Sequence, residues 1–236
     1  QAMYDRMQEL GALVQRMDGT RLSACANLFC VKNDSALNTH TQAVGYNIYF
    51  GWYYGNMADN ADFVDKFHQD NPNTPLGITE YGVDCNLAYH AYEPKVRDYS
   101  EEFQALYHET VYPIFRERPY IWGTYVWNMF DFSSEIRDEG GVRYKNCKGL
   151  ITYDRKVKKD AFYYYKAQWS DEPFVKIAES RFVNREREKI TVKVYSNQPS
   201  VSITVNGVSH TADSNTGVFC FENIALQQGE NKIIAS

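Results

Sequence analysis

A glutamate stands at the end of a short apolar run near the middle of the sequence. Glu80 follows Leu76-Gly77-Ile78-Thr79 and precedes Tyr81-Gly82. An apolar run of this length predicts a strand buried on both faces of a parallel sheet, and a carboxylate at its carboxyl end lies where such sheets gather catalytic side chains. The alternative is a helix cap or a contact with solvent, which is common for an acid just past a strand.

Two further strand-like runs end in aromatic and amide side chains. They are Val44-Gly45-Tyr46-Asn47-Ile48-Tyr49-Phe50-Gly51-Trp52 and Gly123-Thr124-Tyr125-Val126-Trp127-Asn128-Met129-Phe130-Asp131. Aromatic rings stack on sugar rings, and amides and carboxylates hold hydroxyl groups, although each of these residues could instead pack in a core. The candidate binding residues are Asn47, Tyr49, Trp52, Trp127, Asn128 and Asp131.

These runs resemble the second half of the catalytic barrel of glycoside hydrolase family 2 when they are taken in order with Asn146-Cys147-Lys148-Gly149-Leu150-Ile151-Thr152-Tyr153-Asp154-Arg155. Within that family, the sequence is most similar to bacterial β-galactosidases, with β-glucuronidases next. The resemblance implies an α/β fold with strands five to eight of a TIM (β/α)8 barrel over residues 1–171. An all-β immunoglobulin-like sandwich, short enough to be truncated, is expected over residues 172–236.

The resemblance also assigns roles. Glu80 becomes the nucleophile of a retaining hydrolysis and Tyr49 the residue whose hydroxyl contacts it, while Trp127 becomes the floor on which the sugar stacks. A retaining enzyme needs a second carboxyl group as general acid. In this family that acid lies in an Asn-Glu pair at the end of strand four, and the chain contains no Asn-Glu dipeptide. We therefore expect the acid upstream, on a missing amino-terminal half of the barrel, and expect no hydrolysis by the chain alone.

The sugar is left open between two classes. Asn146 and Lys148 resemble the pair with which glucuronidases hold the sugar carboxylate. The flanking segments 138–141 and 152–156 resemble galactosidases more, so we expect a β-galactoside, with a β-glucuronide as the alternative. Val83 replaces the histidine with which the best-known galactosidases hold the primary hydroxyl, which leaves recognition of position six open. A non-catalytic carbohydrate-binding module is a further alternative, but it would need no carboxylate at this strand end.

Periodic apolar residues predict the elements that position these side chains. Strand and helix alternate four times, which is typical of parallel βα units and makes half a closed barrel. We expect strands at residues 22–29, 43–49, 76–80 and 121–128, helices at 3–17, 59–69, 99–116 and 161–169, and a long loop at 131–148. In the sandwich we expect strands at residues 174–177, 189–195, 201–205 and 218–221, with turns such as Asn206-Gly207 between them.

Composition narrows the possible partners and cofactors. The 236 residues carry a net charge of −5 with no basic block, which argues against nucleic acid. No apolar stretch reaches the roughly 20 residues of a membrane span, and the start lacks a signal pattern, so we expect a cytoplasmic protein, with the periplasm as the alternative. The five cysteines and five histidines lack metal-ligand spacing. The family often uses magnesium or sodium, but the sequence shows no ion cage; a homo-oligomer is a further expectation.

Overall fold

The computed structural model describes residues 1–236, which divide into two compact units. The first unit comprises Gln1–Val83 and Thr110–Met129, and the second comprises Asp84–Glu109 and Phe130–Ser236. The helix α3 (Glu101–Arg116) gives its first half to the second unit and its second half to the first. No helix is both long and apolar enough to cross a membrane.

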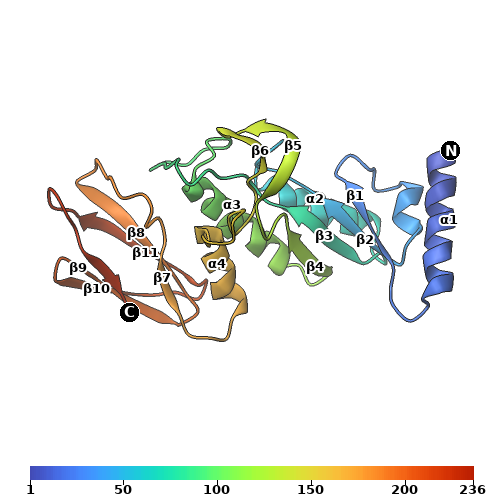
Figure 1. Cartoon of the computed structure of the whole chain (residues 1–236). Helices are drawn as coiled ribbons and strands as arrows, with labels where there is room; N and C mark the ends of the chain where they lie inside the picture. The colour runs from blue at the N-terminus through green and yellow to red at the C-terminus, as the bar shows by residue number, and fades with distance from the viewer. The chain divides into compact units, whose positions relative to one another are not determined.

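The first unit is built on a four-stranded parallel sheet in the order β1-β2-β3-β4 (Figure 1). Its strands are β1 (Ala24–Leu28), β2 (Ala43–Asn47), β3 (Leu76–Tyr81) and β4 (Ile121–Val126). Its remaining elements are α1 (Ala2–Met17), the 3-10 helix η1 (Ala36–Thr39) and α2 (Asp59–Asp70). The sheet order follows the chain order, as expected for part of a barrel, and the sheet is not closed on itself.

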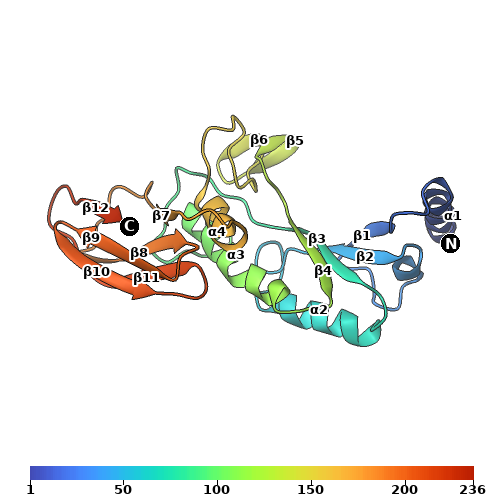
Figure 2. The ribbon, with the colours of Figure 1, turned by 90° about the horizontal axis from the view of Figure 1, so that it is seen from below.

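One face of this sheet packs against α2 (Figure 2). The ring of Tyr46 on β2 meets the rings of Phe63 and Phe67 on α2 at centroid distances of 5.1 and 5.4 Å. Tyr46 and Phe67 are fully buried and Phe63 is half-buried, because the strands present every second residue to the helix. The other buried members of this layer are Val44, Ile48, Val64, Leu76 and Ile78.

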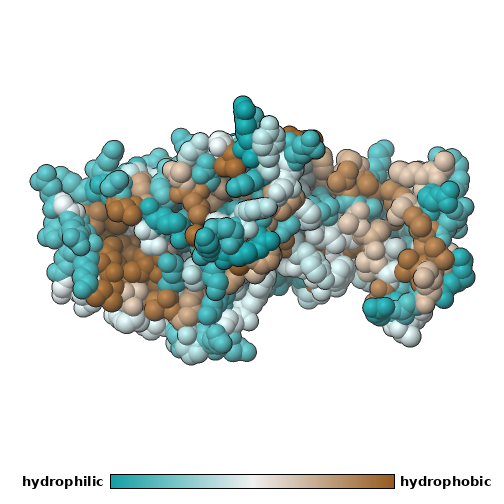
Figure 3. All heavy atoms as spheres, in the orientation of Figure 1, coloured by the Kyte–Doolittle hydropathy of each residue, from teal (hydrophilic) through white to brown (hydrophobic).

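Two expectations for the first unit need correction. Between β1 and β2 the chain forms only the short η1 and no α-helix, so the strand–helix alternation is incomplete at this point. The helix α1 begins one residue before the predicted range 3–17 and ends where predicted, but none of its residues is buried. Figure 3 shows apolar residues at the surface of this part of the chain.

The sandwich of the second unit consists of two three-stranded antiparallel sheets (Figures 1 and 2). One sheet has the order β11-β8-β7 and the other β10-β9-β12. Their strands are β7 (Val175–Ile177), β8 (Lys189–Ser196), β9 (Ser200–Val205), β10 (Val208–Asp213), β11 (Val218–Ala225) and β12 (Ile233–Ala235). Alternate residues of β8, β9 and β11 form one buried core, which includes Val194, Ile203 and Phe219.

The turn predicted at Asn206-Gly207 joins β9 to β10, with φ angles of 50° and 90°. Positive φ at both positions is the geometry that makes Asn-Gly the favoured two-residue hairpin turn. The strands β10 and β12 were absent from the predicted set. The boundary after residue 171 remains a prediction.

The region predicted as a long loop between residues 131 and 148 is instead a β-hairpin. Its strands are β5 (Phe132–Glu139) and β6 (Val142–Asn146), paired antiparallel. Gly140 and Gly141, at φ of 63° and 75°, join them. A Gly-Gly pair is a recognised hairpin signal, but most residues of β5 are polar, so its sequence did not indicate a strand.

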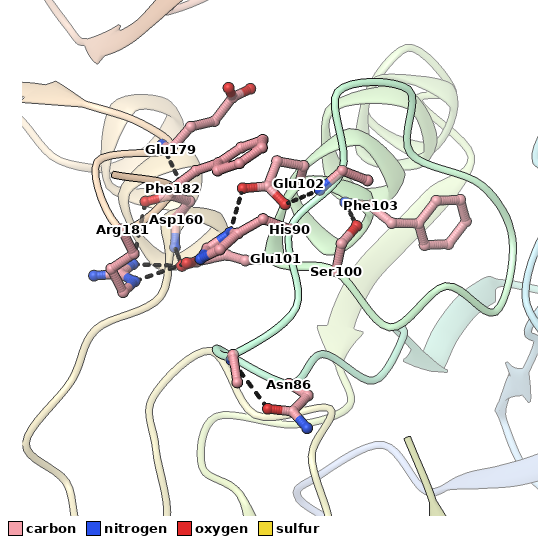
Figure 4. Close-up of polar contacts among 12 residues, drawn as sticks. Asn86, His90, Ser100, Glu101, Glu102, Phe103, Asp160, Glu179, Arg181 and Phe182 are labelled. Atoms are coloured by element: carbon pink, nitrogen blue, oxygen red, sulfur yellow. Dashed lines mark hydrogen bonds and ion pairs between the residues drawn. The ribbon is translucent and has the colours of Figure 1, made fainter. Parts of the chain in front are cut away.

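A buried ionic cluster fastens the loop that joins β7 to β8 of the sandwich (Figure 4). Arg181 donates from Nε to Glu101 on α3 at 2.7 Å and from a terminal nitrogen to Asp160, the first residue of α4 (Asp160–Trp169), at 3.3 Å. Both carboxylates are fully buried. The next residue, Phe182, stacks on His90, whose Nδ1 lies 2.8 Å from Glu102. Three separate segments of the second unit are thereby joined through side chains.

Two buried carboxylates that share one guanidinium cannot both ionise cheaply. Burial, reinforced by the charge of Glu101, raises the pKa of Asp160 to about 7, although Arg181 opposes the shift. The folded state therefore holds a proton that the unfolded chain releases near pH 4. The stability contributed by Asp160 is complete below that pH and is lost as the pH rises through about 7.

We predict that Asp160→Asn removes most of this pH dependence. The wild-type protein should lose a few kcal/mol of unfolding free energy between pH 5 and pH 8 from this group, since one pKa unit corresponds to about 1.4 kcal/mol. The variant should lose much less and should be the more stable protein at pH 8. Thermal unfolding at the two pH values measures this. Asp171→Asn, at an exposed position just beyond α4, is the matched control, and equal pH slopes for all three proteins would contradict the prediction.

Candidate active site

A register shift between β2 and β3 sets the face of the sheet on which Glu80 lies. Ile78 pairs with Tyr46 on the face that packs against the helices, and Tyr81 also lies on that face, since its ring meets Phe115 of α3 at 5.2 Å. Strict alternation would put residue 81 on the opposite face from residue 78. One extra residue is accommodated where the β2–β3 register shifts, after Tyr46 and before the pairing of Asn47 with Glu80. Bulges of this kind redirect side chains next to active sites.

Glu80 accepts a hydrogen bond from Tyr49. The distance from the phenolic oxygen to Oε2 is 2.7 Å, and Glu80 is half-buried. Tyr49 lies just past β2, and its backbone N–H donates to the hydroxyl of Tyr54 at 2.8 Å. The ring of Tyr53 packs edge-on to that of Tyr49 at 5.3 Å. Tyr49, whose hydroxyl contacts the carboxylate, is therefore held in place through its backbone and through its ring.

Asn47 lies beside Glu80, and Trp52 lies in the core. Thr79 donates its hydroxyl proton to Oδ1 of Asn47 at 2.7 Å, which fixes the amide. A Cβ at Gly45 would lie 2.2 Å from a methyl carbon of Thr79, so only glycine leaves room for this arrangement. Trp52 is 2% exposed, which is the position of a core residue and not of a wall open to a ligand.

Trp127 and Asn128 follow the adjacent strand β4. The N–H of Trp127 donates to the carbonyl of Tyr81 at 2.8 Å, and the bond between Trp127 and Asn128 is cis. A Cβ at Gly82, whose φ is +153°, would lie 2.3 Å from the carbonyl oxygen of Trp127. Glycine at position 82 thus permits the close approach of two strand ends. Asn47, Tyr49, Glu80, Trp127 and Asn128 all lie at the carboxyl ends of three adjacent parallel strands.

The remaining predicted residues lie in the second unit, where Asp131 and Lys148 form ion pairs and Asn146 accepts a hydrogen bond. Lys148 is 1% exposed and its ammonium meets Oδ2 of Asp84. Asn146 is buried at the end of β6, and its Oδ1 accepts from the backbone N–H of Lys148 at 3.1 Å. Asp84 also accepts from Arg137 of β5 at 2.9 Å. Buried charges require such partners.

Asp131 organises the same turn from its other side. Its Oδ1 accepts from the ammonium of Lys159 at 2.8 Å and from the N–H of Gly149 at 2.9 Å. Burial raises the pKa of Asp131, while the charge of Lys159 lowers it. A Cβ at Gly149 would lie 2.1 Å from the backbone nitrogen of Asp131, so glycine is required there. Asp131 was predicted to hold sugar hydroxyls. In the structure its side chain binds Lys159 and the backbone of Gly149.

Sequence reasoning missed Thr79, Asp84, Arg137 and Lys159, each of which holds a predicted residue. The only signal for Asp84 was its place four residues after Glu80, which does not distinguish it from a loop aspartate. No group of three or more histidine, cysteine or carboxylate side chains is arranged to hold a metal ion. The catalytic and binding roles of the predicted residues remain predictions.

Glu80 and Tyr49 form an arrangement in which a carboxylate could attack the anomeric carbon of a sugar. A half-buried carboxylate with one oxygen held by a phenol has its second oxygen available for a nucleophilic step. Trp127, half-buried at the next strand end, supplies a flat apolar surface of the kind that stacks on a sugar ring.

No family model matches the chain. A curated beta-glucuronidase from Bacteroides fragilis is 38% identical over 237 residues, which cover 96% of this chain and 33% of that protein. Among solved structures, an FMN-binding beta-glucuronidase from Facaelibacterium prausnitzii L2-6 is 43% identical with a TM-score of 0.97, covering 100% of this chain and 36% of that one. A "putative beta-galactosidase" from Bacteroides fragilis is 33% identical with a TM-score of 0.90, covering 99% of this chain and 37% of that one.

The chain spans about a third of the length of these proteins. Their names denote enzymes that hydrolyse β-glycosides, with glucuronidases and a galactosidase both represented. The structural likeness extends over both the parallel sheet and the β-sandwich, because each match covers nearly all of the chain. The names of the relatives therefore agree with the expected class of enzyme but divide on the sugar.

Proposed function

We propose that this chain carries the nucleophile of a retaining glycoside hydrolase that acts on β-D-glucuronides. The observation that carries the proposal is the hydrogen bond from Tyr49 to Glu80 at the carboxyl end of a parallel strand. A solvent-facing or helix-capping glutamate would have no need of a fixed phenol donor. The names of the relatives support the same class of reaction.

In the proposed reaction, the free carboxylate oxygen of Glu80 attacks the anomeric carbon of the sugar. The bond from that carbon to the aglycone oxygen breaks, and a general acid expected upstream of this chain donates a proton to the leaving oxygen. A glycosyl ester on Glu80 results. Water then attacks the anomeric carbon, gives up a proton to the same upstream residue, and releases the sugar and the free carboxylate. Tyr49 orients the attacking group through both steps.

The sequence led us to expect a galactoside, but the names of the relatives support the glucuronide that we propose. Two of the relatives compared, at 38% and 43% identity, are beta-glucuronidases. A buried lysine beside an asparagine suits a carboxylate, because a charge-assisted hydrogen bond is roughly twice as strong as a neutral one. A neutral galactoside offers Lys148 no such contact. β-Galactoside hydrolysis is the remaining alternative, supported by the 33% identical structure.

We predict that Glu80→Gln in the intact enzyme lowers kcat by roughly a thousandfold or more, as expected when a nucleophile is removed. A 2-deoxy-2-fluoro glucuronide should label Glu80 in the wild type, which peptide mass spectrometry can locate. Tyr49→Phe should lower kcat by about tenfold to a hundredfold, the value of one hydrogen bond to a charged group. Tyr53→Phe, at an exposed neighbouring position, is the control. Tight sugar binding without any labelling would instead support a non-catalytic binding module.

We predict that Lys148→Met raises KM for p-nitrophenyl β-D-glucuronide at least about tenfold more than KM for the matching galactoside, since a lost charge-assisted bond costs about 1.5–3 kcal/mol. Lys156→Met is the matched control, because its side chain is 80% exposed and lies just past the same turn. A wild-type enzyme that hydrolyses the galactoside faster would return the assignment to the galactosidases.

A second candidate function is flavin binding, because one relative is FMN-binding at 43% identity. In the second unit, a hollow of about 250 Å³ is lined by residues that include Tyr92, Arg185, Arg187 and Lys189, and it shares the three basic residues with a hollow of about 1140 Å³. An aromatic ring and arginines suit a flat ring system that carries a phosphate. No step of the proposed hydrolysis passes through a flavin.

We predict that FMN titrated with the intact protein shows quenched flavin fluorescence that saturates, and that Arg187→Ala weakens the affinity. Arg187 is half-exposed and pairs with Glu93 on the surface, so its loss should not unfold the protein. Arg143→Ala, in an exposed pair on the hairpin, is the control. Unquenched fluorescence at high protein concentration would exclude this site.

A further inference from the structure

Asp84 is the residue about which the Asn146–Lys148 turn is organised. Its Oδ1 accepts from the N–H of Cys147 at 3.0 Å, and its Oδ2 receives the ammonium of Lys148. The segments are also joined through the backbone, since the N–H of Cys85 donates to the carbonyl of Cys147 at 3.1 Å. Asp84 is 3% exposed, so it is held by the protein and not by solvent. One carboxylate therefore fixes both the backbone and the charged end of this motif.

Arg137 gives the same carboxylate a second cation. Its guanidinium lies 2.9 Å from Oδ2 of Asp84, the oxygen that Lys148 also contacts. Arg137 is itself held by Glu139 at 3.3 Å, and Glu139 pairs with Arg97 at 3.0 Å. The hairpin β5–β6 thus delivers a guanidinium to Asp84 through a chain of alternating charges that runs toward the surface.

The double pairing affects what Lys148 can do. A buried carboxylate whose only cation turned toward another anion would be left uncompensated, which is costly in a protein interior. With Arg137 on the same oxygen, Asp84 keeps a cationic partner when Lys148 shares its charge. An ammonium has three N–H donors, so Lys148 can donate to Asp84 and to a second carboxylate at once. A lysine held in this way has a fixed direction.

We infer that Asp84 is the positioning residue of the Asn146–Lys148 motif, that Arg137 is its second cationic partner, and that together they set how tightly the enzyme holds the carboxylate of a uronide. This inference rests on the proposed hydrolysis of glucuronides. Asp84 and Arg137 act through Lys148 and are assigned no contact with the substrate. A purely structural role for the same contacts would lower activity on every glycoside alike.

The test compares Asp84→Asn with the wild type in the intact enzyme on p-nitrophenyl β-D-glucuronide and p-nitrophenyl β-D-galactoside. The amide keeps an oxygen for the N–H of Cys147 but lacks the charge that holds Lys148. The KM for the glucuronide should rise at least about tenfold more than that for the galactoside, while kcat on the glucuronide changes much less than KM. Thermal unfolding establishes that the variant is folded.

Arg137→Gln is the second variant. It tests the same pairing from the hairpin side should Asp84→Asn fail to fold. Without the guanidinium, the charge of Lys148 must compensate Asp84 and is less available to the substrate carboxylate. The KM for the glucuronide should therefore rise selectively by several-fold. Arg137→Lys should restore most of the difference because it returns a cation to the same oxygen. Arg143→Gln, on the exposed side of the hairpin, is the matched control and should leave both KM values as they are.

The outcomes distinguish the positioning role of Asp84 from the proposed substrate. Equal losses on both substrates, or no change in Asp84→Asn and Arg137→Gln, would overturn the positioning role. A glucuronide preference that Lys148→Met abolishes and Asp84→Asn leaves intact would overturn it alone. A wild-type enzyme without a glucuronide preference, or one indifferent to Lys148→Met, would overturn the proposed substrate and this inference with it.

Discussion

The candidate active site depends on the register shift between β2 and β3. With strict alternation along β3, Glu80 would share a face with Ile78 and point into the layer packed against α2. The extra residue lets Tyr81 return to that layer while Glu80 meets Tyr49. A carboxylate enclosed among apolar side chains would cost free energy and could not reach a substrate. The small residues Gly45 and Gly82 support the shift, because side chains there would collide with Thr79 and with the backbone of Trp127.

The second unit depends on buried carboxyl groups that are paired with cations, and not on apolar packing alone. Asp84, Asp131 and Asp160 are each buried and each accepts from both a cation and a backbone N–H. Such pairs add little net stability, because removing ions from water offsets their attraction, but breaking one is costly. Their effect is to allow only one arrangement of the segments that they join. That constraint suits a turn that must present a lysine in a fixed direction.

The proposed function unites these two parts through the chemistry of one substrate class. The first unit supplies a carboxylate with a phenol donor, which serves any retaining glycosidase. The second supplies a lysine that pairs with Asp84 and that, in the proposed function, also holds the carboxylate of an anionic sugar. Under this proposal, reaction type and sugar preference belong to different sets of residues, which agrees with relatives of similar fold being named for different sugars.

Apolar periodicity alone determined the four parallel strands, the helices α2, α3 and α4, and the sandwich strands with alternating residues, because burial of one face imposes a period that can be read locally. The apolar stripe of α1 also predicted a helix, although none of its residues is buried. The strand-end position of Glu80 and the turn at Asn206-Gly207 were equally local. Only the tertiary structure revealed the hairpin β5–β6, whose polar strands carry no such period, and the burial of Trp52. It alone also showed that Asp84 meets Arg137 and Lys148, which lie 53 and 64 residues away in the sequence. Pairings between charges so far apart in the chain leave no periodic pattern, since they arise only when folding brings the segments together.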